Sequence, residues 1–168
     1  MTHATNDDEA RIKVRELIEE IRTVMLVTSD TDGLMQARPM SVLAVEGDTV
    51  WFFADANSPK IFEIDQDQGV LLTAAHPSRQ DYVSARGVAR VVQDMAKKKQ
   101  LWTEMARLWF PNGVESPNLV LIAVDLIGAE YWDSPASVAR LAIGYVQALV
   151  AKKTPEIGDN AKVRFQAE

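Results

Sequence analysis

The chain has 168 residues, a hydrophobic fraction of 47% and a formal net charge of −6. These values predict one globular domain, and the negative charge argues against general nucleic-acid binding, which depends on a basic surface. The absence of cysteine, with His3 and His76 as the only histidines, leads us to expect neither disulfides nor a metal site. We see no apolar segment suited to secretion or to crossing a bilayer, so we expect a cytoplasmic protein without membrane contacts.

The first third of the sequence predicts a helix followed by three strands. Apolar residues recur at helical spacing over residues 7–22. Strands are expected at residues 24–30, 34–46 and 49–56, separated by the turn sequences "DTDG" and "EGD". Pro39 lies inside the second strand and indicates an edge position, a bulge or an interruption.

Three more strands are expected further along, at residues 69–76, 81–93 and 119–132. Gly87 marks a bulge or a close backbone approach in the second of these. Six strands with turns between them predict a mainly β fold with added helices, built on a six-stranded antiparallel barrel. We expect one domain over residues 1–168, with the barrel at about 23–133 and a C-terminal helix and tail at 134–168.

Residues 95–110 predict a further helix, which Asp94 is placed to cap. We expect an apolar stripe on this helix, formed by Leu101, Met105, Leu108 and Trp109. The run from Lys97 to Lys99 is interpreted as a solvated face.

The segment "WFFADANSPKIFEI" predicts a strand, a short loop and the start of a helix. Ser58 has the position of the N-cap, and Pro59 suits the first helical position. Lys60 then falls in the first turn, where the helix dipole disfavours a cation. An anion bound at the helix start would reverse this effect. The alternative is that Ser58 only caps the helix and Lys60 points into solvent.

No nucleophile–base pair, nucleophile elbow or phosphate loop is visible in the sequence. If the second and third strands are neighbours, Arg38 approaches the end of the third strand and converges with Lys60. Two cations, a hydroxyl and a helix N-terminus would then surround one anion, and a phosphomonoester suits that arrangement. The alternatives are an Arg38 paired with a carboxylate, and a Trp109 and Trp132 that serve only in a core or an interface.

Five segments in this order, "ARPM", "VWFFADANSPKIFEI", "YVSARGVARVV", "LWTEMARLWFP" and "AEYWD", resemble the FMN-binding split-barrel superfamily. Within it, the chain is most similar to the general stress protein 26 group of pyridoxamine 5′-phosphate oxidase-like proteins. The resemblance implies a split β-barrel, a homodimer, FMN at the subunit interface and a link to the stress response.

The resemblance also implies roles for individual residues. Arg38, Ser58 and Lys60 match the residues that hold the FMN phosphate. Pro39, Met40, Phe53 and Ala54 match positions that lie along the cofactor, and Trp132 matches a residue that reaches the flavin from the partner subunit. Trp109 and Arg140 are candidates for substrate binding.

The sequence departs from the true oxidases at three places. The helix at 95–110 lacks their Tyr, Arg and Ser series, "RLAIG" lacks their histidine after Arg140, and Ala54 replaces a hydroxyl-bearing residue. The resemblance therefore implies an FMN-dependent oxidoreductase with an unknown small-molecule substrate rather than pyridoxamine 5′-phosphate. The alternatives are a flavin-binding stress protein without turnover, or a split barrel that binds a deazaflavin or haem.

Overall fold

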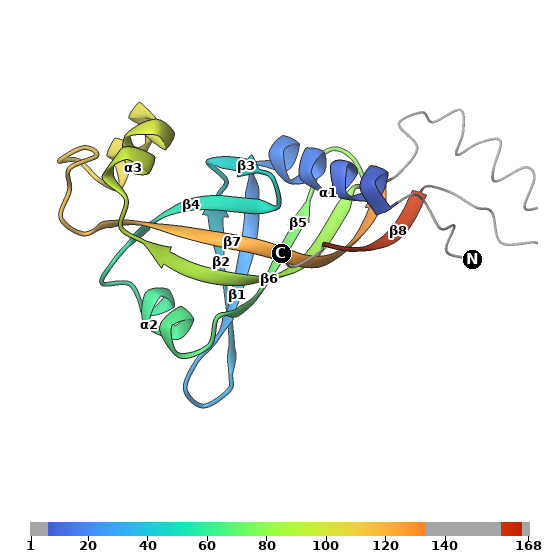
Figure 1. Ribbon diagram of the computed structural model, residues 1–168, viewed down its shortest axis with the longest axis horizontal. Helices are drawn as coiled ribbons and strands as arrows, with labels where there is room; N and C mark the ends of the chain where they lie inside the picture. Colours follow the sequence, from blue (N-terminus) through green and yellow to red (C-terminus); the bar gives the residue numbers. More distant parts are fainter. Residues whose placement is uncertain (1–6, 134–158, 166–168) are drawn as a thin grey trace, which may run out of the picture.

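The computed structural model describes residues 7–133 and 159–165, and the following account is limited to them. A helix precedes four consecutive strands, and the remaining helices lie in the later connections between strands (Figure 1). In chain order the elements are α1 Asp7–Ile21, β1 Thr23–Ser29, β2 Met35–Ser41, β3 Ala44–Glu46, β4 Thr49–Asp55, α2 Pro59–Gln66, β5 Gly69–Ala75, β6 Tyr82–Val92, α3 Met95–Leu101, the 3-10 helix η1 Glu104–Leu108, β7 Leu119–Asp133 and β8 Asp159–Arg164.

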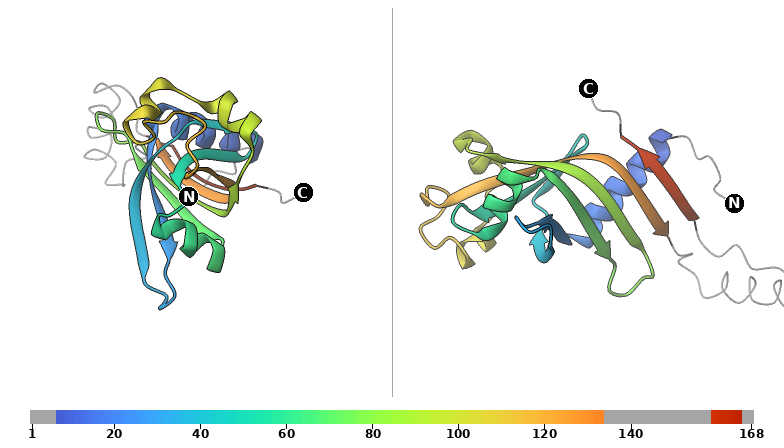
Figure 2. Two further views of the ribbon diagram at one scale, coloured as in Figure 1. Left: turned by 90° about the vertical axis from the view of Figure 1, so that its left-hand side faces the viewer. Right: turned by 90° about the horizontal axis from the view of Figure 1, so that it is seen from below.

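All strand pairs are antiparallel, and the strands follow the order β2-β1-β5-β6-β7-β4-β3, with β8 added alongside β7. The sheet curls around a core, as the two views in Figure 2 show, which confirms the predicted split barrel. The described residues form eight strands rather than six. The second predicted strand is interrupted at Val42 and Leu43 to give β2 and β3, and β8 lies in the expected tail. Pro39 lies in β2, which is an edge strand as expected.

The core is filled by the inward-facing residues of the barrel strands, which alternate with outward-facing ones. On β4, for example, Val50, Phe52 and Ala54 point into the main core, whereas Trp51 and Phe53 point to a smaller cluster beneath α3. The predicted apolar face of α1 is buried against this barrel through Ala10, Val14, Leu17 and Ile18. Figure 1 shows α1 lying across the sheet next to β3 and β5.

Gly87 forms the predicted bulge in β6. The register of the β6–β7 pairing shifts between Arg86 and Gly87. A Cβ atom at Gly87 would lie 2.6 Å from Val124 Cγ1 and 2.8 Å from the Asp125 carbonyl oxygen. Glycine is therefore required here because the backbones of the two strands approach each other closely.

The helix predicted over residues 95–110 is in fact two short helices. The Asp94 side chain caps α3 by accepting a hydrogen bond from the Lys97 N–H at 3.0 Å. The helix then ends at Leu101, and η1 follows after a break. Because 3-10 geometry rotates the side chains, the residues that η1 turns inward are Ala106 and, just after it, Phe110.

Two expectations for this region are therefore wrong. Of the predicted apolar stripe only Leu101 is buried, while Met105, Leu108 and Trp109 are 66–70% exposed. The lysine run is not uniformly solvated either. Lys98 is buried, and its ammonium group donates to Gln93 Oε1 at 2.9 Å. Its aliphatic stem allows a lysine to cover apolar surface in this way.

No helix among the described residues combines the length and the apolar character needed to span a membrane.

Candidate functional site

The junction between β4 and α2 has the predicted form, with Asp55 ending the strand and Ser58 at the N-cap position. The Ser58 hydroxyl does not cap the helix, however. It donates to the Asp55 carbonyl oxygen at 2.6 Å. The Asp55 carboxylate accepts hydrogen bonds from the Asn57 N–H at 2.8 Å and from Asn118 Nδ2 at 2.7 Å. These bonds hold the pKa of Asp55 below its ordinary value, so the carboxylate stays charged and fixes the turn.

Lys60 occupies the first turn of α2 and is half-buried. Burial lowers the pKa of Lys60 below its ordinary value, and the nearby Arg38 guanidinium lowers it further, while Asp55 and Glu63 act in the opposite direction. Within the part of the chain that the structure describes, Lys60 Nζ has no carboxylate within 4 Å and no hydrogen-bond acceptor. This cation is therefore partly desolvated without a direct counter-ion.

Arg38 reaches the same region from β2. The pairing of β1 with β2 places Arg38 opposite Leu26, so its side chain leaves the same face of the hairpin as the inward-facing Thr28. Arg38 Nη1 donates to Thr28 Oγ1 at 2.5 Å, and Nη2 lies 2.9 Å from Glu63 Oε2 on α2. The Thr28 hydroxyl donates to the same Glu63 carboxylate. Arg38 is thus held by two side chains that are themselves buried.

Thr28 and Glu63 are functional candidates that the sequence analysis missed. Thr28 follows Val24 and Leu26 at every second position on the buried face of β1, which was a usable signal. Glu63 is 7% exposed beside Ile64 on the buried side of α2. A glutamate at this helical position does not by itself indicate its partner, because the partner lies on a strand 25 residues earlier.

The structure therefore brings Arg38 and Lys60 together beside the N-cap residue Ser58. The alternative reading of Arg38 also holds in part, because it has a carboxylate partner in Glu63. A guanidinium has five N–H groups, of which two are engaged here, so the fork retains donors for an anion. Two cations and the two carboxylates of Asp55 and Glu63 leave the cluster without excess positive charge. A phosphate would be held here by directed hydrogen bonds, with the Ser58 hydroxyl turned away from the Asp55 carbonyl.

The four other residues expected along the cofactor have different surroundings. Met40 and Ala54 are buried in the main core, so only their backbone is available to a ligand. Pro39 is exposed. Phe53 is half-buried beneath α3, with ring centroids 5.8 Å from Trp102 and 6.4 Å from Phe110.

The predicted aromatic residues lie on other elements than Arg38, Ser58 and Lys60, which we call the phosphate cluster. Trp132 is 38% exposed and pairs across the sheet with Tyr82, which is 46% exposed. Trp109 directly follows η1, and η1 lies with α3 at the opposite end of the molecule from the C-terminal end of β7 (Figure 1). Arg140 lies outside the described residues.

The sequence matches a family model over residues 9–156, and that model describes proteins that are like pyridoxamine 5′-phosphate oxidase. The chain belongs to the pyridoxamine 5′-phosphate oxidase-like family. This membership confirms the resemblance found in the sequence segments. A search of curated proteins finds no match.

Solved structures of other proteins are similar to this chain. A protein assigned to general stress protein 26 from Jannaschia sp. CCS1 is 19% identical, with a TM-score of 0.80, covering 94% of this chain and 99% of its own. The general stress FMN/FAD binding protein from Xanthomonas citri is 29% identical, with a TM-score of 0.67, covering 78% of this chain and 93% of its own. A general stress family protein from Xanthomonas campestris pv. campestris is 28% identical, with a TM-score of 0.67, and the match covers 80% and 93% of the two chains.

Proposed function

We propose that this family member binds FMN and acts as a flavin-dependent oxidoreductase on a small molecule. The observation that carries the proposal is the meeting of Arg38 and Lys60 at the start of α2, where Lys60 has no direct counter-ion among the described residues. Partly desolvated cations beside a helix N-terminus favour a phosphate group. The similar Xanthomonas citri protein, which binds FMN or FAD, supports a flavin as the bearer of that phosphate.

The flavin and the protein side chains would have different roles in the reaction. A bound flavin would supply the electron transfer, and the protein would bind and orient it. Arg38 offers a planar fork and Lys60 a point charge to the phosphate, and Glu63 with Thr28 holds the fork in place. Ser58 adds a hydroxyl once it turns from the Asp55 carbonyl.

We further propose a homodimer in which each flavin contacts both chains. β7 begins at Leu119, which pairs with Asp55 next to the phosphate cluster, and Trp132 follows 13 residues later on the same strand. At a rise of about 3.4 Å per residue the strand covers roughly 40 Å between them. One FMN molecule does not span that length, so Trp132 would serve the flavin of the partner chain.

The substrate is not expected to be pyridoxamine 5′-phosphate. The segment that carries the substrate-phosphate residues in the true oxidases is divided here into α3 and η1, and it presents the exposed Met105, Leu108 and Trp109 instead. An apolar surface of this kind suits a less charged substrate. Trp109 and Arg140 remain our candidates for contacting it.

The test compares FMN with riboflavin, which has the same ring system and no phosphate. We expect FMN to bind more tightly by at least tenfold in a fluorescence-quenching titration, because charge-assisted hydrogen bonds are worth about 1.5–3 kcal/mol each. Equal affinities would show that Arg38, Ser58 and Lys60 do not hold the FMN phosphate.

The visible spectrum of the purified protein separates a flavin from a deazaflavin or haem. Reduction by NADH or NADPH followed by reoxidation separates an oxidoreductase from a flavin-binding protein without turnover.

A further inference from the structure

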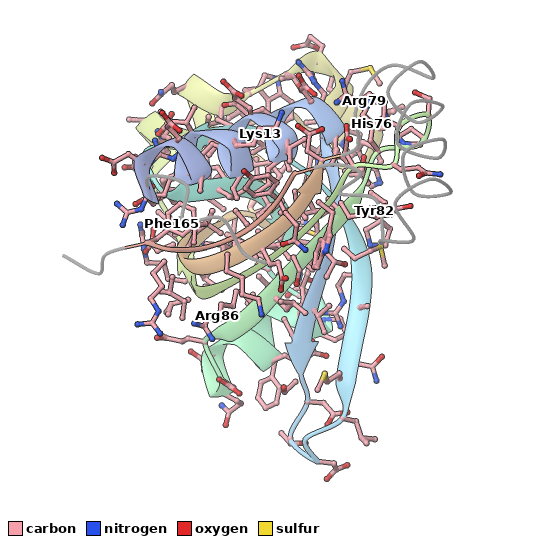
Figure 3. The ribbon with its side chains drawn as sticks, turned by 90° about the vertical axis from the view of Figure 1, so that its right-hand side faces the viewer. Lys13, His76, Arg79, Tyr82, Arg86 and Phe165 are labelled. Carbon is pink, nitrogen blue, oxygen red and sulfur yellow. The ribbon has the colours of Figure 1, made fainter. Side chains whose placement is uncertain are left out.

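A cavity of about 590 Å³ lies on the outer face of the sheet, where β6, β7 and β8 run side by side. Figure 3 shows Arg86, one of its lining residues, on the side of the sheet away from α1 and Lys13. The cavity is separate from the phosphate cluster, which is built from β1, β2 and α2. A volume of this size is typical of small-molecule sites and exceeds what a simple inorganic ion needs.

Gly128 forms the floor of this cavity, between two arginines. In the sheet it pairs with Arg86 on β6 and with Arg164 on β8, and both arginines line the cavity. A Cβ atom at Gly128 would lie 2.9 Å from Arg86 Nε and 3.2 Å from its Nη2. Because Gly128 has no side chain, the Arg86 guanidinium can lie directly over β7 at this position.

The charges of the lining are unbalanced. Three cations, Arg86, Lys162 and Arg164, face one carboxylate, Glu130, whose Oε2 lies 3.6 Å from Lys162 Nζ. Across residues 7–133 and 159–165, neither the Arg86 nor the Arg164 guanidinium has a carboxylate within 4 Å or donates a hydrogen bond. Two uncompensated guanidinium groups on the two strands that flank β7, in a chain with net charge −6, are a local positive site.

We propose that this cavity binds a small organic phosphate, with Arg86 and Arg164 on the phosphate group. Guanidinium groups match the oxygens of a phosphate in pairs, and a dianion balances two cations. Leu71 lines the cavity from β5 and offers apolar surface to the organic part of the ligand. The lining residues Ser84 and Glu130 lie two residues along the same strands from Tyr82 and Trp132, so the cavity adjoins the face that we propose to contact the partner's flavin.

The experiment titrates the full-length protein, saturated with FMN, with adenosine 5′-monophosphate in a calorimeter at low ionic strength. Adenosine serves as the uncharged ligand and inorganic phosphate as the ion without an organic part. We expect adenosine 5′-monophosphate to bind more tightly than both, and Arg86→Gln/Arg164→Gln to weaken it by at least tenfold. If the protein takes up no FMN, the same titration is run without it, so failure of the proposed function leaves this test intact.

The matched control is Arg90→Gln, which removes one positive charge from the same strand at a residue that pairs with Asp125 outside the cavity. It should bind adenosine 5′-monophosphate like the wild type. Gly128→Ala keeps the net charge but displaces the Arg86 guanidinium, and we expect several-fold weaker binding. Equal binding of adenosine and its monophosphate, or an Arg90→Gln loss as large as that of the double variant, would overturn the proposal.

Discussion

The carboxylate of Glu63 lies 2.9 Å from the guanidinium of Arg38 and is itself almost fully buried. The pair joins α2 to the edge strand β2, with Thr28 bridging the two side chains. Glu63 therefore has two opposing effects on a phosphate at this site. It orients the Arg38 fork, and it places a negative charge beside an incoming anion.

Replacing Glu63 by Gln separates these two effects. We expect the protein without flavin to lose about 1–3 kcal/mol of unfolding free energy, because Arg38 keeps its partly buried position without a counter-ion. FMN should bind about fivefold more tightly relative to riboflavin, since a repulsive charge near the phosphate is removed. Chemical denaturation and flavin titration measure the two quantities. An FMN preference that falls below that of the wild type would show that orientation by Glu63 dominates.

Lys60→Ala should weaken FMN by 1.5–3 kcal/mol, or about 10- to 150-fold, with riboflavin little affected. The reason is that Lys60 has no direct counter-ion among the described residues and is placed to bind one. Lys98 is unsuitable as a control because it is buried, so we choose Lys99→Ala, whose side chain is 57% exposed. Similar FMN affinities for the two variants would mean that Lys60 only faces solvent.

The preference for FMN over riboflavin should decline at alkaline pH. The pKa of Lys60 lies below its ordinary value of 10.5 in the protein alone, because burial and Arg38 disfavour the ammonium form. A phosphate dianion favours that form, so FMN binding takes up a proton and weakens as the pH rises toward 10.5. The unfolded chain keeps the ordinary pKa of lysine and therefore binds more protons than the folded protein between the lowered pKa and 10.5. The protein without flavin thus gains stability as the pH rises through this range. The ratio of FMN to riboflavin affinity, measured from pH 7 to 10.5, should fall in the wild type and stay constant in Lys60→Ala.

Trp132→Ala should weaken FMN binding and leave the chain folded, because Trp132 is 38% exposed and would contact the partner's flavin. Ile127→Ala is the matched control, at a residue of the same strand that is 39% exposed. We expect sedimentation over a dilution series to show a dimer that FMN strengthens. A monomer that binds FMN with full affinity would exclude the two-chain site.

The sequence was sufficient to predict the barrel and its antiparallel strands, because alternating apolar residues and turn sequences are local signals. We expected Arg38 to approach Lys60 through a pairing of the second and third strands, but β2, which carries Arg38, pairs with β1, and only β3 pairs with β4 on that side. Arg38 reaches α2 instead through its contacts with Thr28 and Glu63. The contacts of Thr28 and Glu63 with Arg38 depend on how α2 packs against β1 and β6, which no local pattern encodes. The break between α3 and η1 was missed for a similar reason, because burial of Ala106 and Phe110 outweighs a continuous helical spacing.

We expect the phosphate cluster to form only after β7 has paired with β4. β4 leads directly into α2, yet its neighbours in the sheet are β3, which pairs with β4 alone, and β7. The contact between Thr49 and Asp125 joins residues 76 positions apart, and closures of this kind are typical of slow-folding β proteins. We therefore expect Lys60 to reach Arg38 only after the barrel has closed. FMN should leave the refolding rate in stopped-flow fluorescence unchanged and slow the unfolding rate instead, whereas faster refolding with FMN would show that the cluster forms early.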